Sequence, residues 1–147
     1  MTSSSARHEA LVDKDALREL ISRFGFTVDS GNYTGLYSLL SEEVVMEIDE
    51  RMVIRGVEKL VRMGDEPVWG ATQHLYTDVV PDVTGNRATI LANLVAIHVQ
   101  KGKPSEHYDF GARYKFEAER ADDGSWWLSR IVITKLWESG NDQQMFE

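Results

Sequence analysis

The sequence predicts an α+β fold in which N-terminal helices pack on one face of a curved antiparallel sheet. Residues 13–63 place many of their apolar side chains at the spacing of a helical face. After them, long segments rich in β-branched and aromatic residues alternate with turn signals, which is typical of a meander of antiparallel strands. Helices followed by strands define this fold class. A pocket is expected between the helices and the concave face of the sheet.

The first helix is predicted to begin after Asp13, a favoured N-cap residue, and to end near Ser30 and Gly31, since glycine suits a C-terminal turn. One face of it is apolar, with Leu17, Leu20, Ile21, Phe24 and Val28 at helical spacing. Two short helices and two short strands follow. The helices are predicted over 33–40 and 57–63, and the strands over 44–49 and 52–55.

Four long strands are predicted for the rest of the chain, over residues 73–83, 87–100, 108–120 and 126–137. Turn residues separate them at Gly85, Gly102 and Gly124. The length of 147 residues suits one domain. We expect this domain to cover residues 11–140, after a disordered polar leader over 1–10.

The C-terminal tail, residues 141–147, has two interpretations. Gly140 would allow a hinge, and Met145 and Phe146 would give the tail an apolar plug, so that it closes the pocket as a lid. Simple fraying of a chain terminus is the alternative.

Composition excludes several classes of function. The net charge is −8, with 24 acidic against 16 basic residues, which disfavours nucleic-acid binding and attraction to anionic membranes. The absence of cysteine excludes disulfides and thiolate chemistry. Histidines do not stand at metal-ligand spacing, and no glycine-rich phosphate loop is present, so neither a metal nor an organic cofactor is expected. With no signal peptide and no apolar run of membrane-spanning length, we expect a cytoplasmic protein.

Three residues are candidates for acid–base chemistry: Asp29, His74 and His98. His98 follows Ile90, Ala92, Leu94 and Ala96 at even spacing, so it shares their inward face. It is either a structural histidine held by a backbone carbonyl or a proton shuttle. Asp29 ends the first helix, where the helix dipole disfavours a carboxylate. It is either solvated or points into the pocket and orients a histidine.

Four motifs resemble the SnoaL-like branch of the nuclear-transport-factor-2-like superfamily, and within it the scytalone dehydratase family. They are Asp-x-x-Asn-Tyr at 29–33, Thr-Gln-His at 72–74, Gly-x-Arg-Tyr at 111–114 and Asp-Gly-x-Trp at 123–126. The resemblance implies a cone-shaped, cystatin-like roll of about three helices on a strongly curved mixed or antiparallel sheet. It implies that Asp29 pairs with His98 as general base and acid, and that His74 is a second proton donor or acceptor.

The resemblance also has departures. Val28 and Ile48 stand where the dehydratases have the two tyrosines that polarise the substrate carbonyl. A related reaction through an enolate, with His74 stabilising the oxyanion, is therefore expected rather than the same dehydration. The expected substrate-binding residues are Phe24, Tyr33, Ile48, Trp69, Tyr114 and Trp137.

The function expected from this reading is that of a cofactor-independent dehydratase, cyclase or isomerase. Its substrate would be an apolar oxygenated small molecule, such as a polyketide or aromatic intermediate. The alternative is a non-catalytic small-ligand-binding or assembly module of the same fold. Epoxide opening, with Arg113 and Asp49 as parts, is disfavoured because strand alternation turns Arg113 away from Tyr114.

Trp126 and Trp127 are adjacent in a strand and must face opposite sides. An aromatic side chain on the outer sheet face predicts a homo-oligomer formed through that face, a dimer in the first place and a trimer as the alternative.

Overall fold

The computed structural model describes residues 3–143. These residues form three helical segments and six strands, which confirms the α+β class. The helices are α1 (Ser4–Asp29), the 3-10 helix η1 (Tyr33–Ser38) and α2 (Val57–Arg62). The strands are β1 (Leu40–Ile48), β2 (Met52–Arg55), β3 (Trp69–Thr84), β4 (Arg87–Gln100), β5 (Lys103–Arg120) and β6 (Trp126–Ser139).

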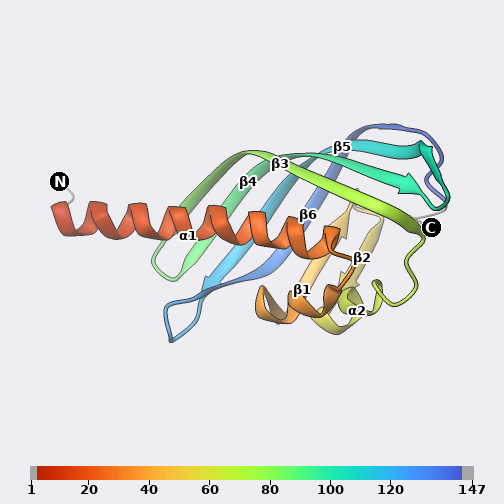
Figure 1. Ribbon diagram of the computed structural model, residues 1–147. Helices are drawn as coiled ribbons and strands as arrows, with labels where there is room; N and C mark the ends of the chain where they lie inside the picture. The colour runs from red at the N-terminus through yellow and green to blue at the C-terminus, as the bar shows by residue number, and fades with distance from the viewer. Residues whose placement is uncertain (1–2, 144–147) are drawn as a thin grey trace.

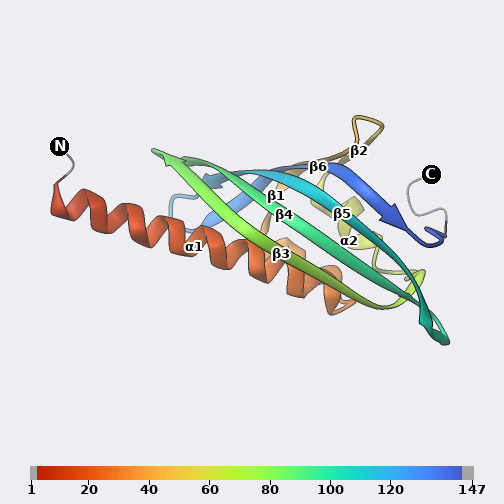
Figure 2. The ribbon, with the colours of Figure 1, turned by 90° about the horizontal axis from the view of Figure 1, so that it is seen from above.

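The strands form one mixed sheet in the order β2-β1-β6-β5-β4-β3. β1 and β6 pair in parallel, and the other neighbours pair antiparallel. The sheet is open, since β2 and β3 are its two edges. Figures 1 and 2 show that its long strands curve strongly and that α1 crosses one face of them. The predicted arrangement of helices on a curved sheet is therefore confirmed.

The helix α1 begins earlier than the sequence pattern suggested. Ser3 is its N-cap, and the Ser3 hydroxyl accepts a hydrogen bond from the backbone N–H of Ala6 at 3.1 Å. Asp13 lies inside the helix instead, where its carboxylate binds the Arg120 guanidinium through two hydrogen bonds of 2.7 and 2.8 Å. The part of the leader from Ser4 to residue 10, expected to be disordered, is thus helical. The side chains of this stretch are almost all exposed, so the sequence has no apolar face there that would predict a helix.

The core lies between α1 and the inner face of the sheet. Even-numbered residues of β4 and β5 are buried along most of each strand, and they include Ile90, Leu94, His98, Tyr108 and Phe116. On β3, a bulge at Asp78 with φ of 54° breaks the alternation between Thr77 and Val80. Before this bulge the inward-facing side chains are Thr72, His74 and Tyr76. The first half of β3 therefore carries three polar residues of the inner face, beside His98 of β4.

A second bulge lies near the end of β6. Gly111 pairs with Trp137 and Ala112 pairs with Lys135, so Leu136 is an extra residue in the β6 strand. Because one added residue reverses the faces of a strand, Trp137 points to the outer side of the sheet. There its indole covers Gly111, where a side chain would collide with the ring.

The possible lid lies largely outside the described residues, because these end at residue 143 and the plug residues Met145 and Phe146 follow. Gly140 has a φ of 95°, and its backbone lies against the carbonyl of His107. Across the described part of the chain, no helix is long and apolar enough to cross a membrane.

Candidate active site

An apolar cavity of about 120 Å³ lies between the C-terminal end of α1, the short helices and the inner face of the sheet. Five of the six predicted substrate-binding residues line it: Phe24, Tyr33, Ile48, Trp69 and Tyr114. The other apolar lining residues include Val28, Leu36, Met46, Leu60, Met63 and Phe110. Thr72, His74 and His98 are the polar residues of β3 and β4 in its wall.

Trp137, the sixth predicted wall residue, does not line this cavity. Its side chain is on the outer face of the sheet and is 48% exposed. Strict alternation along β6 would have placed it on the same inward face as Ile131 and Ile133, both of which are buried. The bulge at Leu136 reverses that face, and the sequence carries no signal for it.

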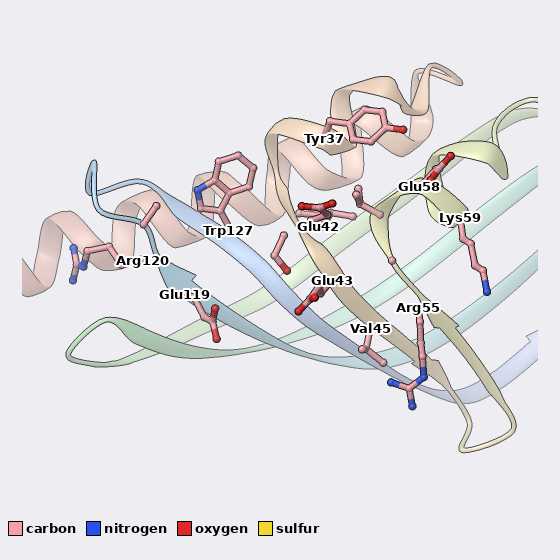
Figure 3. A pocket seen from close by; sticks show the side chains of 15 residues that line it. Tyr37, Glu42, Glu43, Val45, Arg55, Glu58, Lys59, Glu119, Arg120 and Trp127 are labelled. Atoms are coloured by element: carbon pink, nitrogen blue, oxygen red, sulfur yellow. The ribbon is translucent and has the colours of Figure 1, made fainter.

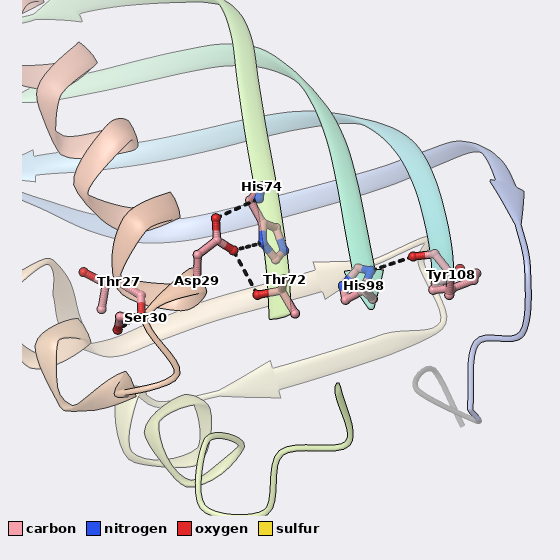
Figure 4. Close-up of polar contacts among 7 residues, drawn as sticks. All are labelled: Thr27, Asp29, Ser30, Thr72, His74, His98 and Tyr108. Atoms are coloured by element: carbon pink, nitrogen blue, oxygen red, sulfur yellow. Dashed lines mark hydrogen bonds and ion pairs between the residues drawn. The ribbon is translucent and has the colours of Figure 1, made fainter. Parts of the chain in front are cut away.

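Asp29 and His74 form the main polar contact of the site (Figure 4). Nδ1 of His74 lies 2.6 Å from Oδ1 of Asp29, and the backbone N–H of His74 donates to Oδ2 at 2.8 Å. The Thr72 hydroxyl donates to Oδ1 at 3.0 Å. The side chains of His74 and Asp29 are 10% and 18% exposed, so the pair is largely shielded from solvent. One carboxylate thus holds both the ring and the backbone of the histidine.

The ends of α1 and β3 bring these groups together. Asp29 is the last residue of α1, and Ser30 closes the helix by donating its backbone N–H to the Phe26 carbonyl at 2.9 Å. One turn earlier, Gly25 is buried against β3, where an added Cβ would lie 3.2 Å from the Tyr76 ring. The missing side chain lets the helix approach the strand closely. A glycine inside a helix costs about 0.5–1 kcal/mol relative to alanine, so its place here has a packing reason.

The charge of Asp29 sets the protonation of the pair. Burial would raise the pKa of its carboxyl group. The hydrogen bonds and the charge of His74, helped by the Thr72 hydroxyl, outweigh burial and hold that pKa below its ordinary value. An ionised carboxylate only accepts hydrogen bonds, so Nδ1 of His74 carries a proton. In the neutral ring Nε2 then has the free lone pair, and Figure 4 shows this nitrogen turned away from Asp29.

His98 occupies a different environment, and the expected pairing of Asp29 with His98 was wrong. Nδ1 of His98 lies 3.1 Å from the carbonyl oxygen of Tyr108, and the residue is 1% exposed. Burial, together with the nearby His74, lowers the pKa of His98 to about 4. The sequence left two interpretations of His98 open, and this bond is the one in which a backbone carbonyl holds a structural histidine. The pairing fails because the Asp29 carboxylate is taken by His74 and Thr72 of β3, while His98 on the next strand bonds to the Tyr108 carbonyl.

The two histidines nevertheless share the cavity. Their ring centroids are 5.6 Å apart and the rings meet edge to face. His74 and His98 both line the cavity, and Asp29 reaches it through His74. Two of the three candidate residues therefore line one cavity, and the third is bound to one of them.

Tyr76 is a cavity residue that the sequence interpretation left out of the site. Its ring meets that of Tyr114 edge to face, with centroids 5.2 Å apart. Burial and the neighbouring Tyr114 raise the pKa of Tyr76, and burial raises that of Tyr114. Both hydroxyls thus stay protonated. The sequence could have placed Tyr76 in the site, because it stands two residues after His74 and alternate residues of a strand share a face.

A larger hollow of about 1220 Å³ lies elsewhere on the molecule (Figure 3). Its wall includes Glu42, Glu43, Arg55, Lys59 and Trp127, and none of the predicted site residues. Charges of both signs stand open to solvent there, without a convergent polar pair. Within residues 3–143, no group of three or more potential ligands could hold a metal ion.

Helices on a curved open sheet, with a carboxylate–histidine contact at the wall of an apolar cavity, define a small α+β domain suited to binding or transforming a small molecule. The chain belongs to the SnoaL-like domain family, whose profile matches residues 9–132. Among curated proteins, none matches the sequence.

Solved structures share the fold at low sequence identity. A putative scytalone dehydratase from Novosphingobium aromaticivorans has a TM-score of 0.80 at 15% identity, with 90% of this chain and 89% of that chain covered. A hexachlorocyclohexane dehydrochlorinase, LinA type 3 from Novosphingobium barchaimii, has a TM-score of 0.79 at 17% identity, covering 92% and 94%. An NTF2-like protein with a cystatin-like fold from Novosphingobium aromaticivorans has a TM-score of 0.77 at 21% identity, covering 97% and 94%. The expected superfamily and cystatin-like fold are thus confirmed.

Proposed function

We propose that the protein is a cofactor-independent acid–base enzyme, a lyase or isomerase, in which the Asp29–His74 pair moves a proton on a compact apolar substrate. The observation that carries this proposal is the 2.6 Å contact between Oδ1 of Asp29 and Nδ1 of His74 at the wall of an apolar cavity. A carboxylate that fixes the Nδ1–H tautomer leaves Nε2 as a base and stabilises the imidazolium that forms when it takes a proton.

The proposed step begins at a carbon next to a carbonyl or another electron-withdrawing group. Nε2 of His74 removes a proton from this carbon, and the electron pair of the C–H bond becomes a π bond. In a lyase, a leaving group on the adjacent carbon departs with its own bonding pair. In an isomerase, the proton returns from His74 to another carbon. Neither the elimination nor the isomerisation requires a metal or an organic cofactor.

Protonated hydroxyls of the cavity wall are available to stabilise developing negative charge. Tyr33 lines the cavity, and burial together with the charge of Asp29 raises the pKa of its hydroxyl. Tyr76 and Tyr114 are on the opposite wall, formed by the sheet. Neutral phenols at such positions can donate to an oxyanion. In this proposal the tyrosines polarise the substrate oxygen, which Val28 and Ile48 cannot do.

The shape of the cavity narrows the substrate class. Its volume of about 120 Å³ is below the range of roughly 300–1,000 Å³ that is typical of ligand pockets. A compact ring-sized molecule therefore fits this proposal better than an extended polyketide chain. Two of the similar structures are a putative scytalone dehydratase and a hexachlorocyclohexane dehydrochlorinase, names that denote the elimination of a small molecule from carbon. Elimination is accordingly the favoured form of the reaction.

The test is enzyme-dependent C–H exchange in D₂O, followed by NMR over a panel of ring-sized carbonyl compounds and eliminable halides or alcohols. We expect Asp29→Asn and His74→Gln to lower exchange by about 10²- to 10⁴-fold, the usual contribution of a general base. His107→Gln is the matched control, because His107 also contacts a carboxylate, that of Asp109 at 2.9 Å, but on the exposed surface. It should keep the wild-type rate.

Exchange that survives both Asp29→Asn and His74→Gln would contradict the proposal. Tight binding of panel compounds without exchange or turnover would instead favour the non-catalytic ligand-binding module.

We also propose that copies of the chain associate through the outer face of the sheet. Leu75, Val95 and Trp137 lie in one row across β3, β4 and β6, with Gly111 of β5 between the last two. They are 43%, 39% and 48% exposed. A row of exposed apolar side chains is what an interface between subunits contains at its centre. Of the two adjacent tryptophans, Trp126 is buried and Trp127 borders the larger hollow.

A further inference from the structure

One side-chain nitrogen in the cavity wall has no hydrogen-bond partner within residues 3–143: Nε2 of His98. The residue is 1% exposed and lines the same cavity as His74. Buried polar atoms are paired in the great majority of cases, because an unpaired one loses its hydration without compensation. This nitrogen therefore needs a partner that enters the cavity.

The chemical state of this nitrogen follows from its neighbour in the ring. Nδ1 of His98 lies 3.1 Å from the Tyr108 carbonyl oxygen, which can only accept, so Nδ1 carries the proton. Burial disfavours a second proton on the ring and lowers the pKa of His98 to about 4. At neutral pH the ring is therefore neutral, and Nε2 presents a lone pair. It is an acceptor that only a donor can satisfy.

The surroundings of His98 make this acceptor selective. Phe110 stacks on the ring with centroids 5.5 Å apart, and Trp69 tilts over it at 5.1 Å. Tyr108, at 5.7 Å, completes the aromatic surroundings, and its hydroxyl donates to Glu138. A flat apolar ligand fits beside these rings. A charged ammonium donor would lose its hydration without gaining a counter-charge, since the Asp29 carboxylate is already engaged by His74 and Thr72.

We infer that Nε2 of His98 binds a hydroxyl group of a compact aromatic or alicyclic ligand, with the hydroxyl donating the hydrogen bond. The substrate class is thus a hydroxylated ring compound, and His98 is the residue that selects the hydroxyl. A carbonyl or ether oxygen at the same place would have no proton to offer and would leave Nε2 unpaired. This deepens the proposed function and rests on it only in taking the ligand to be the substrate.

The spacing of the two histidines joins this subsite to the proposed chemistry. The ring centroids of His74 and His98 are 5.6 Å apart. A six-membered ring whose hydroxyl is bound at His98 therefore lies within reach of His74 as well. His98 orients the molecule, and His74 with Asp29 acts on the adjacent C–H bond.

The experiment uses the full chain and two probes, phenol and anisole. They share a ring, but anisole has a methyl ether in place of the hydroxyl donor. We expect phenol to bind about tenfold or more tightly in calorimetric titrations, the effect of leaving one buried acceptor unpaired. At saturation with phenol, the ¹⁵N resonance of the bare Nε2 of His98 should move upfield, as it does when this nitrogen accepts a hydrogen bond. Anisole should leave it in place.

The variant His98→Phe keeps an aromatic ring but has no acceptor, so it should bind phenol and anisole about equally. His107→Gln, an exposed histidine changed, should keep the preference for phenol. Equal affinities in the wild type, an unmoved Nε2 resonance at saturation, or no binding of either probe would each overturn the inference. The resonance test needs only the wild type, so a poorly folded His98→Phe does not remove it.

The outcome can be separated from that of the proposed function, because binding needs no turnover. A preference for phenol without any C–H exchange refutes the acid–base enzyme and leaves the hydroxyl site. C–H exchange that depends on His74, without a preference for hydroxylated rings, refutes the hydroxyl site alone.

Discussion

The two cavity histidines differ in the group that accepts the hydrogen bond from Nδ1–H. For His74 it is an ionised carboxylate, and for His98 it is a neutral backbone carbonyl. A carboxylate stabilises an imidazolium, whereas a buried carbonyl does so only weakly against the cost of desolvation. His74 is therefore the residue suited to taking up a proton, and His98 is suited to staying neutral.

This difference predicts a pH dependence of stability. In the unfolded chain His98 takes up a proton below about pH 6.5, but in the native protein only near pH 4. Between these values protons bind preferentially to the unfolded state, so the free energy of unfolding falls as the pH is lowered from 6.5 to 4. We expect His98 to account for about 2–3 kcal/mol of the loss between pH 7 and pH 4.5.

Urea unfolding at pH 7 and pH 4.5 measures this contribution. His98→Phe should lose less stability on acidification than the wild type by that amount, although it can be less stable at both pH values. The carboxyl of Asp29, whose pKa is held below its ordinary value, is present in both proteins, so its contribution cancels in the comparison. An equal loss in His98→Phe and wild type would show that His98 is not held neutral.

The roles of single residues were only partly predictable from the sequence. Asp29, His74 and His98 could all be named as candidates from the helix end, strand alternation and the resemblance to scytalone dehydratases. The partner of Asp29 was not predicted. Asp29 and His74 are far apart in the sequence, and their contact depends on how α1 packs along β3. His74 donates hydrogen bonds from both its backbone N–H and its ring to one carboxylate, a geometry that spacing along the chain cannot show.

At the scale of elements, strands without bulges were predicted best. The limits of β2 and β4 agree with the predicted residues 52–55 and 87–100, because alternation and the turn residues fix both ends. The β6 bulge escaped prediction, and with it the outward position of Trp137. Bulges depend on how a strand pairs with its neighbour, here at Gly111 and Ala112, which a single strand does not encode.

The close packing of α1 on β3 gives a prediction for Gly25. A Cβ at this position would lie 3.2 Å from the Tyr76 ring, and valine adds two further methyl groups to the same crowded space. We expect Gly25→Val to lower the free energy of unfolding by about 1–3 kcal/mol, the usual effect of overpacking. It should also push α1 away from the strand and weaken the contact between Asp29 and His74, so that C–H exchange falls.

Phe26→Val is the matched control, because position 26 follows directly on the same helix and is 78% exposed. It introduces the same β-branched side chain without crowding β3. Denaturant unfolding compares the two variants. If Gly25→Val is no less stable than Phe26→Val, the Gly25 site has room for a side chain and does not set the distance between helix and strand.

At the scale of the whole molecule, the fold was the most predictable property. Helices before long alternating strands left few arrangements, and an open curved sheet covered by helices on one face is what the chain forms (Figure 2). In a single copy the outer face of that sheet is exposed to solvent. Whether copies associate therefore depends on this whole face.

The apolar row of the outer face predicts how self-association responds to salt. The chain has a net charge of −8, so two copies repel each other at low ionic strength, while burial of Leu75, Val95 and Trp137 favours association. We expect sedimentation velocity to show a larger oligomer fraction at 0.5 M than at 0.05 M NaCl. Leu75→Lys and Val95→Lys should shift the protein to monomer in both, because each buries a charge in the interface. Leu11→Lys, at a position of α1 that is 68% exposed and away from the sheet, should behave like the wild type. If Leu11→Lys disrupts association as strongly as Val95→Lys, the contact surface includes α1, and the outer face of the sheet is not what joins the copies.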